Sequence, residues 1–348
     1  MSLSQTAPDI TVIPADRRML WLLLSGLAIV GLSLLALRFG LRTMGWSDII
    51  AALRSYDATN PDHITLLEIR LPRLIGALIA GAALGASGAL IQGLTRNPLA
   101  DPGLLGLNGG AALGVVLCIF ALGITDPAQF IWAAMLGAVS AAGLVLTLGG
   151  GTKGTTVRLI LAGAAASALF MALTRGLLMI SQQALEVYRY WVLGGFNGID
   201  VATVQTLLPF FAVGALLAAI AAPGLNALLL GEDTARSLGL RVGLIRILAI
   251  PATLCLCAAT VAMAGPIAFV GLIVPHLARA ISGPDMRWVL LFSTTIGAAL
   301  MISADLLGRL PLLGSNMQAG VLAAMIGGPT LIALILFNRS TPLQRGAR

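Results

Sequence analysis

The sequence predicts an all-α, polytopic membrane protein with about ten transmembrane helices, and three observations lead to this fold class. Of its 348 residues, 58% are hydrophobic and only 10% are charged, whereas soluble domains carry about 25% charged residues. Mean hydropathy is +0.97. The apolar residues form continuous runs, unlike the short alternating segments of an outer-membrane barrel. A soluble enzyme, a disordered chain and a coiled coil are therefore excluded.

Ten apolar stretches can cross a bilayer, for which a helix needs roughly 20 residues. They are residues 19–37, 72–94, 103–123, 128–148, 159–180, 201–222, 244–264, 266–280, 289–307 and 318–337. The first follows Arg17 and Arg18 and is longer than the core of a signal peptide. The eighth is the shortest and is interrupted by Pro275. We expect residues 1–348 to form a single transmembrane domain.

Positive charge predicts the orientation of these spans, because Lys and Arg accumulate on cytoplasmic segments. Thirteen of the 21 Lys and Arg residues lie on segments that face inward when the N-terminus is inside, and seven lie outside. Both tails, residues 1–18 and 338–348, are therefore expected in the cytoplasm. The net charge of +7 follows from this bias and does not indicate binding of nucleic acid.

Residues 223–243 are predicted to lie in the cytoplasm as short helices. Pro223 and Gly224 are expected to end the sixth span, Gly231 to break the following helix, and Gly239 to stop it. Glu232 and Arg236 form an i,i+4 pair in the favourable order. Four apolar residues could share one face: Leu228, Leu229, Ala235 and Leu238. This segment suits either docking of a cytoplasmic partner or an ordinary interfacial amphipathic loop.

Charges near the membrane give two further expectations. Arg175 lies within the fifth span, five residues before its outer end, so it either snorkels to the outer surface or faces an aqueous path and attracts an anionic cargo. Outside, Arg70 and Arg73 flank Pro72 in a compact turn that suits the carboxylates of a docking protein. Asp101 and Asp305 are expected at opposite ends of their spans, away from the membrane centre, which argues against coupling to protons or sodium.

Catalytic and cofactor motifs are missing from the sequence. The two histidines, His63 and His276, form no zinc-protease motif, and the glycine-rich loop at residues 149–154 lacks the order of a phosphate-binding P-loop. The cysteines, Cys118, Cys255 and Cys257, are expected to be small core residues. No catalytic residue, metal site or bound cofactor is predicted for this chain.

Several strings of residues together resemble the FecCD-type permeases, which are the membrane subunits of type II ABC importers for ferric siderophores, haem and cobalamin. The strings occur in the family's order, from about residue 65 to 337. They are Arg70-Leu-Pro-Arg73, Gly81-Ala-Ala-Leu-Gly-Ala-Ser-Gly88, Gln92-Gly-Leu-Thr-Arg-Asn97-Pro98-Leu99-Ala100-Asp101-Pro102, Gly231-Glu-Asp-Thr-Ala-Arg-Ser-Leu-Gly239, Gly265-Pro-Ile-Ala-Phe-Val-Gly-Leu-Ile-Val-Pro275-His276 and Ala304-Asp305-Leu-Leu-Gly-Arg309.

The resemblance implies a ten-helix subunit of the bacterial inner membrane, with spans two to five and seven to ten related by inverted pseudosymmetry. It implies a second permease subunit in a homo- or heterodimer, a binding protein outside, and two cytoplasmic ATPase subunits that bind ATP and Mg²⁺. The ATPases would contact the segment that contains Gly231, Glu232, Asp233, Ala235, Arg236, Leu238 and Gly239, together with Leu228 and Leu229.

The resemblance also assigns gate and docking positions. Arg70, Arg73 and Arg309 match positions that meet acidic residues of the binding protein. Four positions match the cytoplasmic gate: Asn97, Leu99, Thr156 and Leu161. Ser181 and Gln182 lie near the periplasmic gate.

The expected cargo is a ferric catecholate siderophore, with haem or cobalamin as the alternative. Two alternative functions do not depend on this resemblance: an ion-coupled secondary transporter, and a membrane scaffold without a transport role.

Overall fold

The chain folds into a bundle of helices in a computed structural model that describes residues 15–151, 156–310 and 317–338. Helices and turns make up these described segments, with no β-strand among them. In chain order the elements are α1 (Ala15–Arg38), α2 (Trp46–Arg54), α3 (Pro61–Ile64), the π-helical turn η1 (Thr65–Arg70), α4 (Leu71–Thr95), the 3₁₀ turn η2 (Pro102–Leu105), α5 (Leu107–Leu122), α6 (Pro127–Leu148), α7 (Thr156–Ile180), α8 (Gln182–Trp191), α9 (Val201–Leu229), α10 (Glu232–Ser237), α11 (Val242–Ala264), α12 (Val270–Ser282), α13 (Met286–Arg309) and α14 (Ala319–Asn338).

Each of the ten predicted spans corresponds to one of these helices. Seven helices within the described residues are long and apolar enough to cross a membrane, namely α1, α4 with its lead-in from Pro61, α6, α7, α9, α11 and α13. Three further apolar helices, α5, α12 and α14, are shorter. The predicted fold class, all-α with about ten spans, is therefore confirmed. The predicted tails fall outside the described residues, apart from Ala15 to Arg18 and Asn338.

Two prolines do not act as the sequence suggested. Pro223 was expected to end the sixth span, but α9 continues through it to Leu229. The extra turns are held by Asn226, whose Nδ2 donates to Asp285 Oδ1 (2.8 Å) and whose Oδ1 accepts from Met286 N (2.7 Å) at the start of α13. Pro275 likewise lies inside α12 instead of breaking it. In the eighth span the non-helical part precedes Val270.

Asp101 lies deeper than predicted, because the segment after α4 folds back into the bundle. Gln92 Nε2, on the last turns of α4, donates to Ala100 O at 3.1 Å. The ring of Pro102 then packs on Gly271 of α12, beside the backbone of Leu84 halfway along α4. The turn η2 consequently contacts α4, α5, α6 and α7. The third span begins inside the bundle, which explains why α5 has only 16 residues.

Helix α4 forms the centre of the bundle and packs against α9, α11, α12 and α13. Glycines allow the closest of these contacts. A Cβ on Gly81 would lie 2.2 Å from Gly297 O on α13, and a Cβ on Gly297 would lie 2.2 Å from Gly81 O. Because small residues let helix backbones approach in lipid, this crossing is stabilised by packing and not by the hydrophobic effect.

The two halves of the chain have matching elements, as the predicted pseudo-repeat requires. Helices α4 to α7 correspond in order to α11 to α14. The second member of each set, α5 or α12, is short and follows a lead-in that is not α-helical. Contacts are reciprocal, since α4 packs on α13 and α11 packs on α6, while α4 and α11 also contact each other.

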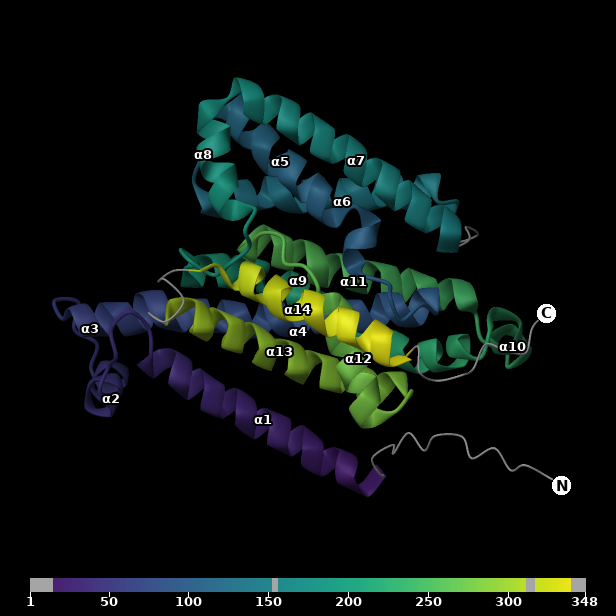
Figure 1. The fold of residues 1–348 in the computed structure, drawn as a ribbon, viewed down its shortest axis with the longest axis horizontal. Helices are drawn as coiled ribbons and strands as arrows, with labels where there is room; N and C mark the ends of the chain where they lie inside the picture. The colour runs from purple at the N-terminus through teal and green to yellow at the C-terminus, as the bar shows by residue number, and fades with distance from the viewer. Residues whose placement is uncertain (1–14, 152–155, 311–316, 339–348) are drawn as a thin grey trace.

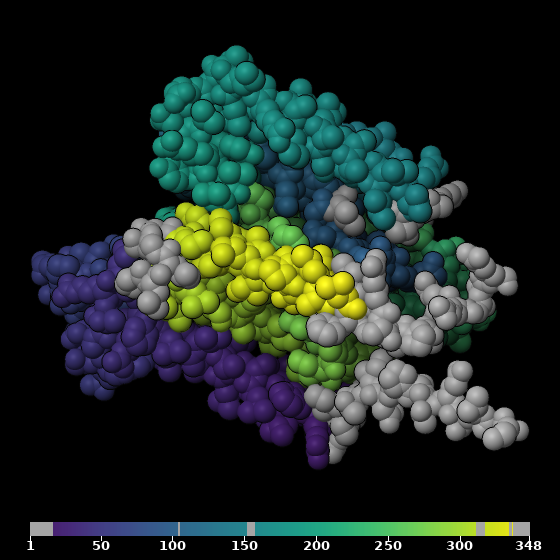
Figure 2. Space-filling view, in the orientation of Figure 1, coloured from purple at the N-terminus to yellow at the C-terminus, as the bar shows by residue number. Residues whose placement is uncertain are grey.

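The bundle has two distinct ends. One carries α2, α3 and α8, and the other carries α10, the start of α1 and the end of α14 (Figure 1). The two ends of the described chain thus lie at the same end of the bundle, as an even number of crossings requires. Helices α1 and α7 are peripheral and form opposite edges of the face shown in Figure 2.

Candidate functional site

A buried charge cluster joins α4 and α13 at the end of the bundle that carries α2 and α3. Asp305 accepts from Arg73 Nε at 2.7 Å through Oδ1, and its Oδ2 lies 3.1 Å from Arg309 Nη2. Arg73 also donates to Asn197 Oδ1, which lies in the turn before α9. The two arginines are 6% exposed and Asp305 is 1% exposed. These side chains are therefore fixed by contacts within the chain.

Arg70 closes the end of α1. Its Nη1 donates to Leu37 O (2.6 Å) and Arg38 O (2.8 Å), and its Nη2 donates to Arg42 O. The last carbonyls of a helix have no partner within the helix, so the Arg70 guanidinium satisfies those at the end of α1. Like Arg73 and Arg309, Arg70 is 6% exposed.

The arginines were expected to be surface charges, and this expectation is wrong for all three. Burial of the cluster nevertheless leaves an excess of positive charge, because Arg73 and Arg309 share the single carboxylate of Asp305 and Arg70 lies close enough to repel Arg309 electrostatically. Within the described part of the chain, Arg73 Nη2 has no hydrogen-bond acceptor. An acidic group placed near this cluster would be attracted to it.

The predicted cytoplasmic gate positions lie on two segments, the turn after α4 and the start of α7. Asn97 Oδ1 accepts from Leu99 N at 3.0 Å, and Ala100 N donates to Asn97 O at 3.1 Å, so Asn97 shapes a tight turn that presents Leu99 to the outside. Leu161 is also exposed, on α7. Thr156 is the first residue of α7, and its side chain is outside the described part of the structure. The turn η2, which follows the Asn97 turn, contacts α7, and Gly106 after it lies near Ser167 and Phe170.

The predicted periplasmic gate residues form the junction between α7 and α8. Ser181 is the N-cap of α8, and its Oγ accepts from Ala184 N at 3.2 Å. Gln182 Nε2 lies 3.4 Å from Glu186 Oε1 on the exposed side of α8. Both residues therefore help to define where α8 begins and how it leaves α7.

A small cavity of about 260 Å³ lies beside Arg175, between α5, α7 and α8. Its lining residues are Ala112, Met171, Thr174, Arg175 and Tyr188. Burial raises the pKa of Tyr188 above its ordinary value of 10.0, and the nearby Arg175 guanidinium opposes that rise. Thr174 is 2% exposed, and its hydroxyl has no partner among the described residues. The cavity therefore combines a cation with a buried, unused hydroxyl.

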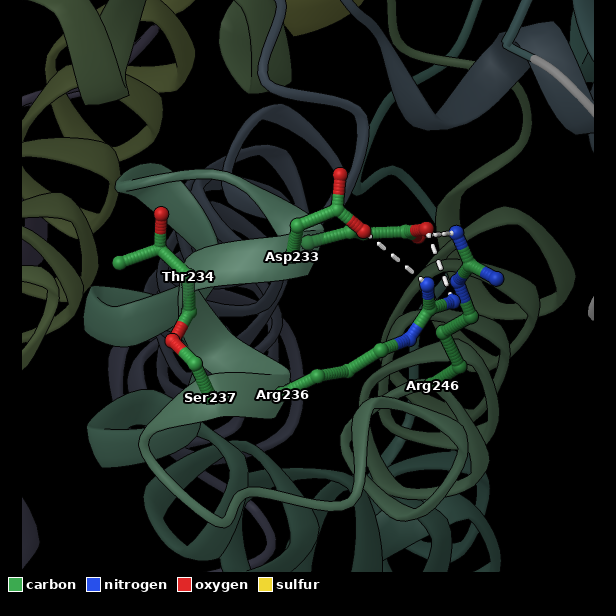
Figure 3. Close-up of polar contacts among 6 residues, drawn as sticks. Asp233, Thr234, Arg236, Ser237 and Arg246 are labelled. Atoms are coloured by element: carbon green, nitrogen blue, oxygen red, sulfur yellow. Dashed lines mark hydrogen bonds and ion pairs between the residues drawn. The ribbon is translucent and has the colours of Figure 1, made fainter.

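The predicted coupling segment contains the short helix α10 at the opposite end of the bundle. Glu232 pairs with Arg236 one turn later (3.3 Å) and with Arg246 of α11, and Arg236 also pairs with Asp233 (3.3 Å). Figure 3 shows Arg236 of α10 and Arg246 of α11 side by side; both pair with Glu232, and only Arg236 pairs with Asp233. Gly231 and Gly239 have φ of +113° and +81°, a region that glycine adopts at low cost. The Glu232–Arg246 pair holds α10 against α11, and the other two pairs lie within α10.

The four apolar residues of this segment do not share one face. Leu228 and Ala235 are buried in the chain itself, whereas Leu229 and Leu238 are exposed together with Leu230 and Leu240. The predicted face was wrong because Gly231, at a φ of +113°, interrupts the helix between α9 and α10, so the two segments do not share one helical register. The exposed leucines define an apolar surface, which we call the α9–α10 leucine surface: Leu229, Leu230, Leu238 and Leu240.

Sequence reasoning missed several residues of these sites. Asn197 and Thr174 have no neighbouring motif that would indicate a role, and their contacts come from segments far apart in the chain. Gln92 stands inside one of the recognised strings, yet its four contacts could not be read from the string. In the described ranges, no group of three or more His, Cys, Asp or Glu residues could hold a metal ion.

Comparison with known proteins gives three findings. A family model described as the FecCD transport family matches residues 27–337. The probable siderophore transport system permease protein YfiZ of Bacillus subtilis (strain 168) is 38% identical, over 84% of this chain and 89% of that protein. The ferric enterobactin transport system permease protein FepD of Escherichia coli (strain K12) is 37% identical, over 86% of this chain and 90% of that protein.

Similarity extends to a solved structure. A structure described as an inward-facing conformation of a putative metal-chelate type ABC transporter superposes with a TM-score of 0.80 at 29% identity. The match covers 91% of this chain and 99% of that one. The similarity therefore includes the arrangement of the helices as well as the sequence.

Proposed function

Because this chain belongs to the FecCD transport family, we propose that it is the membrane-spanning subunit of an ATP-driven importer that moves a ferric siderophore into the cytoplasm. The chain performs no hydrolysis itself, and a separate ATPase would bind ATP and Mg²⁺. The family membership supports a multi-pass protein of the bacterial inner membrane. Of the alternatives, an ion-coupled secondary transporter would need no such ATPase.

The observation that supports docking of ATPase subunits is the α9–α10 leucine surface beside the ion-paired helix α10. The four leucines lie at the end of α9 and just after α10, and they flank a short helix that the Glu232–Arg246 ion pair joins to α11. Interfaces are centred on such patches with polar rims. We assign this end to the cytoplasm, because the positive charge of the loops favours that side. Two ATPases would then move α10, and α10 would transmit the motion to α9 and α11.

At the other end, the buried arginine cluster supports docking of an acidic binding protein. Three guanidiniums lie near one another, and among the residues that the structure describes only Asp305 pairs with Arg73 and Arg309. Carboxylates of a docking protein would balance the excess charge and accept from Arg73 Nη2. Since the arginines are buried, the docking protein would act through the field of the cluster or after a small opening of the outer turns.

We further propose that cargo passes along α7 at the interface with a second permease subunit. Helix α7 is rich in Ala and Gly, and most of its side chains are exposed. A smooth wall of this kind would bind a large cargo weakly, as passage requires. Asn97, Leu99, Thr156 and Leu161 would close the inner side, and Ser181 and Gln182 would border the outer side. Arg175 and the adjacent cavity would attract an anionic cargo.

The test is purification of the chain with the ATPase encoded beside it, followed by ATPase assays with candidate binding proteins. We expect a stable complex whose hydrolysis rises when a binding protein loaded with a ferric catecholate siderophore is added. A protein loaded with haem or cobalamin that stimulates more strongly would assign the cargo to that class. Transport without any associated ATPase would contradict the proposal.

A further inference from the structure

Helix α12 contains a gap in its hydrogen bonding at Pro275. In a regular helix the N–H of residue 275 would donate to the carbonyl of Gly271, but proline has no N–H and its ring pushes that carbonyl outward. The displaced oxygen points at α4, because a Cβ on Gly88 would lie only 1.9 Å from Gly271 O. Glycine at position 88 makes room for a carbonyl that lacks its normal donor.

Gln92 supplies the missing donor. It lies one turn after Gly88 on the same face of α4 and is 2% exposed. Its Nε2 is 3.3 Å from Gly271 O and 3.0 Å from Leu272 O, so one of its two N–H groups is shared between these two carbonyls while the other donates to Ala100 O. Its Oε1 accepts from Arg279 Nη2, further along α12. A glutamine side chain of α4 thus supplies a hydrogen-bond donor at the place where Pro275 removes one from α12.

The same amide also holds the segment after α4. Gln92 Nε2 donates to Ala100 O at 3.1 Å, in the turn that Asn97 shapes and that carries Leu99. Pro102, two residues later, packs on Gly271 itself. One side chain therefore joins α12 to residues 97–101, two segments separated by about 170 residues in the sequence.

We propose that Gln92 is a positioning residue for the cytoplasmic gate, which makes residues 97–101 and the Pro275 region of α12 move as one unit. This inference rests on the proposed function, since it concerns the same gate. When the bundle changes between its outward- and inward-open states, a shift of α12 is carried directly to Leu99. The competing interpretation gives Gln92 a role in packing alone.

Hydrogen–deuterium exchange of the full chain in lipid nanodiscs tests the link without cargo or ATPase. Gln92→Leu removes all four contacts. Gln92→Glu keeps the size and the acceptor for Arg279 but loses the amide donors. We expect both variants to speed exchange by roughly tenfold in residues 97–101 and in residues 271–279, as loss of a buried hydrogen-bond network implies. Peptides of α5 and α6 should stay unchanged, which separates this effect from general loosening.

Two further variants sharpen the test. Ser87→Ala is the matched control, because Ser87 is also fully buried on α4 but, among the described residues, bonds only to Leu84 O in its own helix, at 3.0 Å. Pro275→Ala restores the backbone donor to Gly271 O, so in that background Gln92→Glu should affect α12 less while still loosening residues 97–101. The proposal is overturned if Gln92→Leu speeds hydrogen–deuterium exchange in only one of the two segments, residues 97–101 or 271–279. It is also overturned if the increase is no larger than that caused by Ser87→Ala.

The transport consequence is measured separately in proteoliposomes that contain the complete importer. With ferric enterobactin as the probe, Gln92→Glu should lower the iron transported per ATP hydrolysed by at least about fivefold, while ATPase activity persists. Unchanged coupling together with faster exchange would overturn the gating role. If the unaltered importer moves no ferric siderophore, the proposed function fails, and the exchange experiment still decides whether the link exists.

Discussion

Arg73 on α4 and Asp305 on α13 form an ion pair with Nε and Oδ1 2.7 Å apart, although 232 residues separate them in the chain. Both side chains are almost fully buried, and the same carboxylate also faces Arg309. Removing one partner from a buried pair leaves an uncompensated charge, which costs far more than losing an exposed pair. The pair therefore fixes the start of α4 and the end of α13 relative to each other.

Asp305→Asn is expected to lower the free energy of unfolding by about 3–5 kcal/mol, because Arg73 and Arg309 stay buried without a counter-charge. Denaturant unfolding in detergent measures the change. Asp62→Asn is the control, since its partner Arg42 is 76% exposed at 3.3 Å and such pairs contribute about 0–1 kcal/mol. Equal losses in the two variants would contradict the structural role of Asp305.

Gly297→Ala is expected to destabilise the bundle by about 1–3 kcal/mol, because the new Cβ would lie 2.2 Å from Gly81 O and would push α4 and α13 apart. Thermal unfolding measures the effect. Gly143→Ala on α6 is the matched control, since nothing lies within 4 Å of its added Cβ and alanine favours a helix. We expect that control to be neutral or slightly stabilising; similar losses at both positions would argue against the close crossing.

Asp200 caps α9, and hydrogen bonds from Thr203 lower the pKa of its carboxyl from the ordinary value of 3.8. A lowered native pKa means that the stabilisation is complete above pH 3.8 and is lost as the pH falls through the native value. Asp200→Ala should cost about 0.5–2 kcal/mol at neutral pH. Asp200→Asn should keep the cap and flatten the loss of stability in acid, as measured by unfolding between pH 2 and 7. An unchanged acid profile would exclude Asp200 as a contributor.

Leu238→Asp is expected to weaken binding of the ATPase by at least about tenfold, because it places a charge in the α9–α10 leucine surface. Leu53→Asp on α2, at the other end of the bundle, is the control: the two leucines are 62% and 61% exposed. Affinity of the purified components in detergent measures the loss. If Leu53→Asp weakens binding as much as Leu238→Asp does, the ATPase surface lies elsewhere.

Arg175→Ala is expected to slow uptake of an anionic ferric siderophore several-fold at unchanged protein level, because the path loses its cation. Arg175→Lys should retain most of the uptake, and Thr174→Val tests the buried hydroxyl beside it. Radiolabelled iron in membrane vesicles provides the measurement. Unchanged uptake in Arg175→Ala would return the residue to a role in snorkelling at the outer surface.

The spans could be predicted because length and apolar composition are properties of each segment alone. The residues at which the helices begin and end were harder to predict. Pro223 looked like a terminator, since the two hydrogen bonds of Asn226 to residues 285 and 286 are invisible in the sequence. Asp101 looked like a residue at the membrane surface, because no local pattern reveals that the chain folds back after α4.

The candidate site was predicted in its composition but not in its geometry. The family strings identified Arg70, Arg73 and Arg309, yet their burial depends on Asp305, Asn197 and carbonyls of α1 that come from distant segments. On α10, the i,i+4 pair of Glu232 and Arg236 is confirmed, because a helix alone sets that distance. Arg246, the third member, required the packing of α11.

One side of the folded chain, formed by helix α7, is largely exposed. Only 17% of the residues in its apolar window are buried, and small side chains make up much of its exposed face. In lipid, small residues of this kind let helices associate through close van der Waals packing. Where a second copy provides that packing, mass action links folding to assembly. The melting temperature of this chain in detergent would then rise with its own concentration, and in the cell the survival of each copy would follow the supply of its partner.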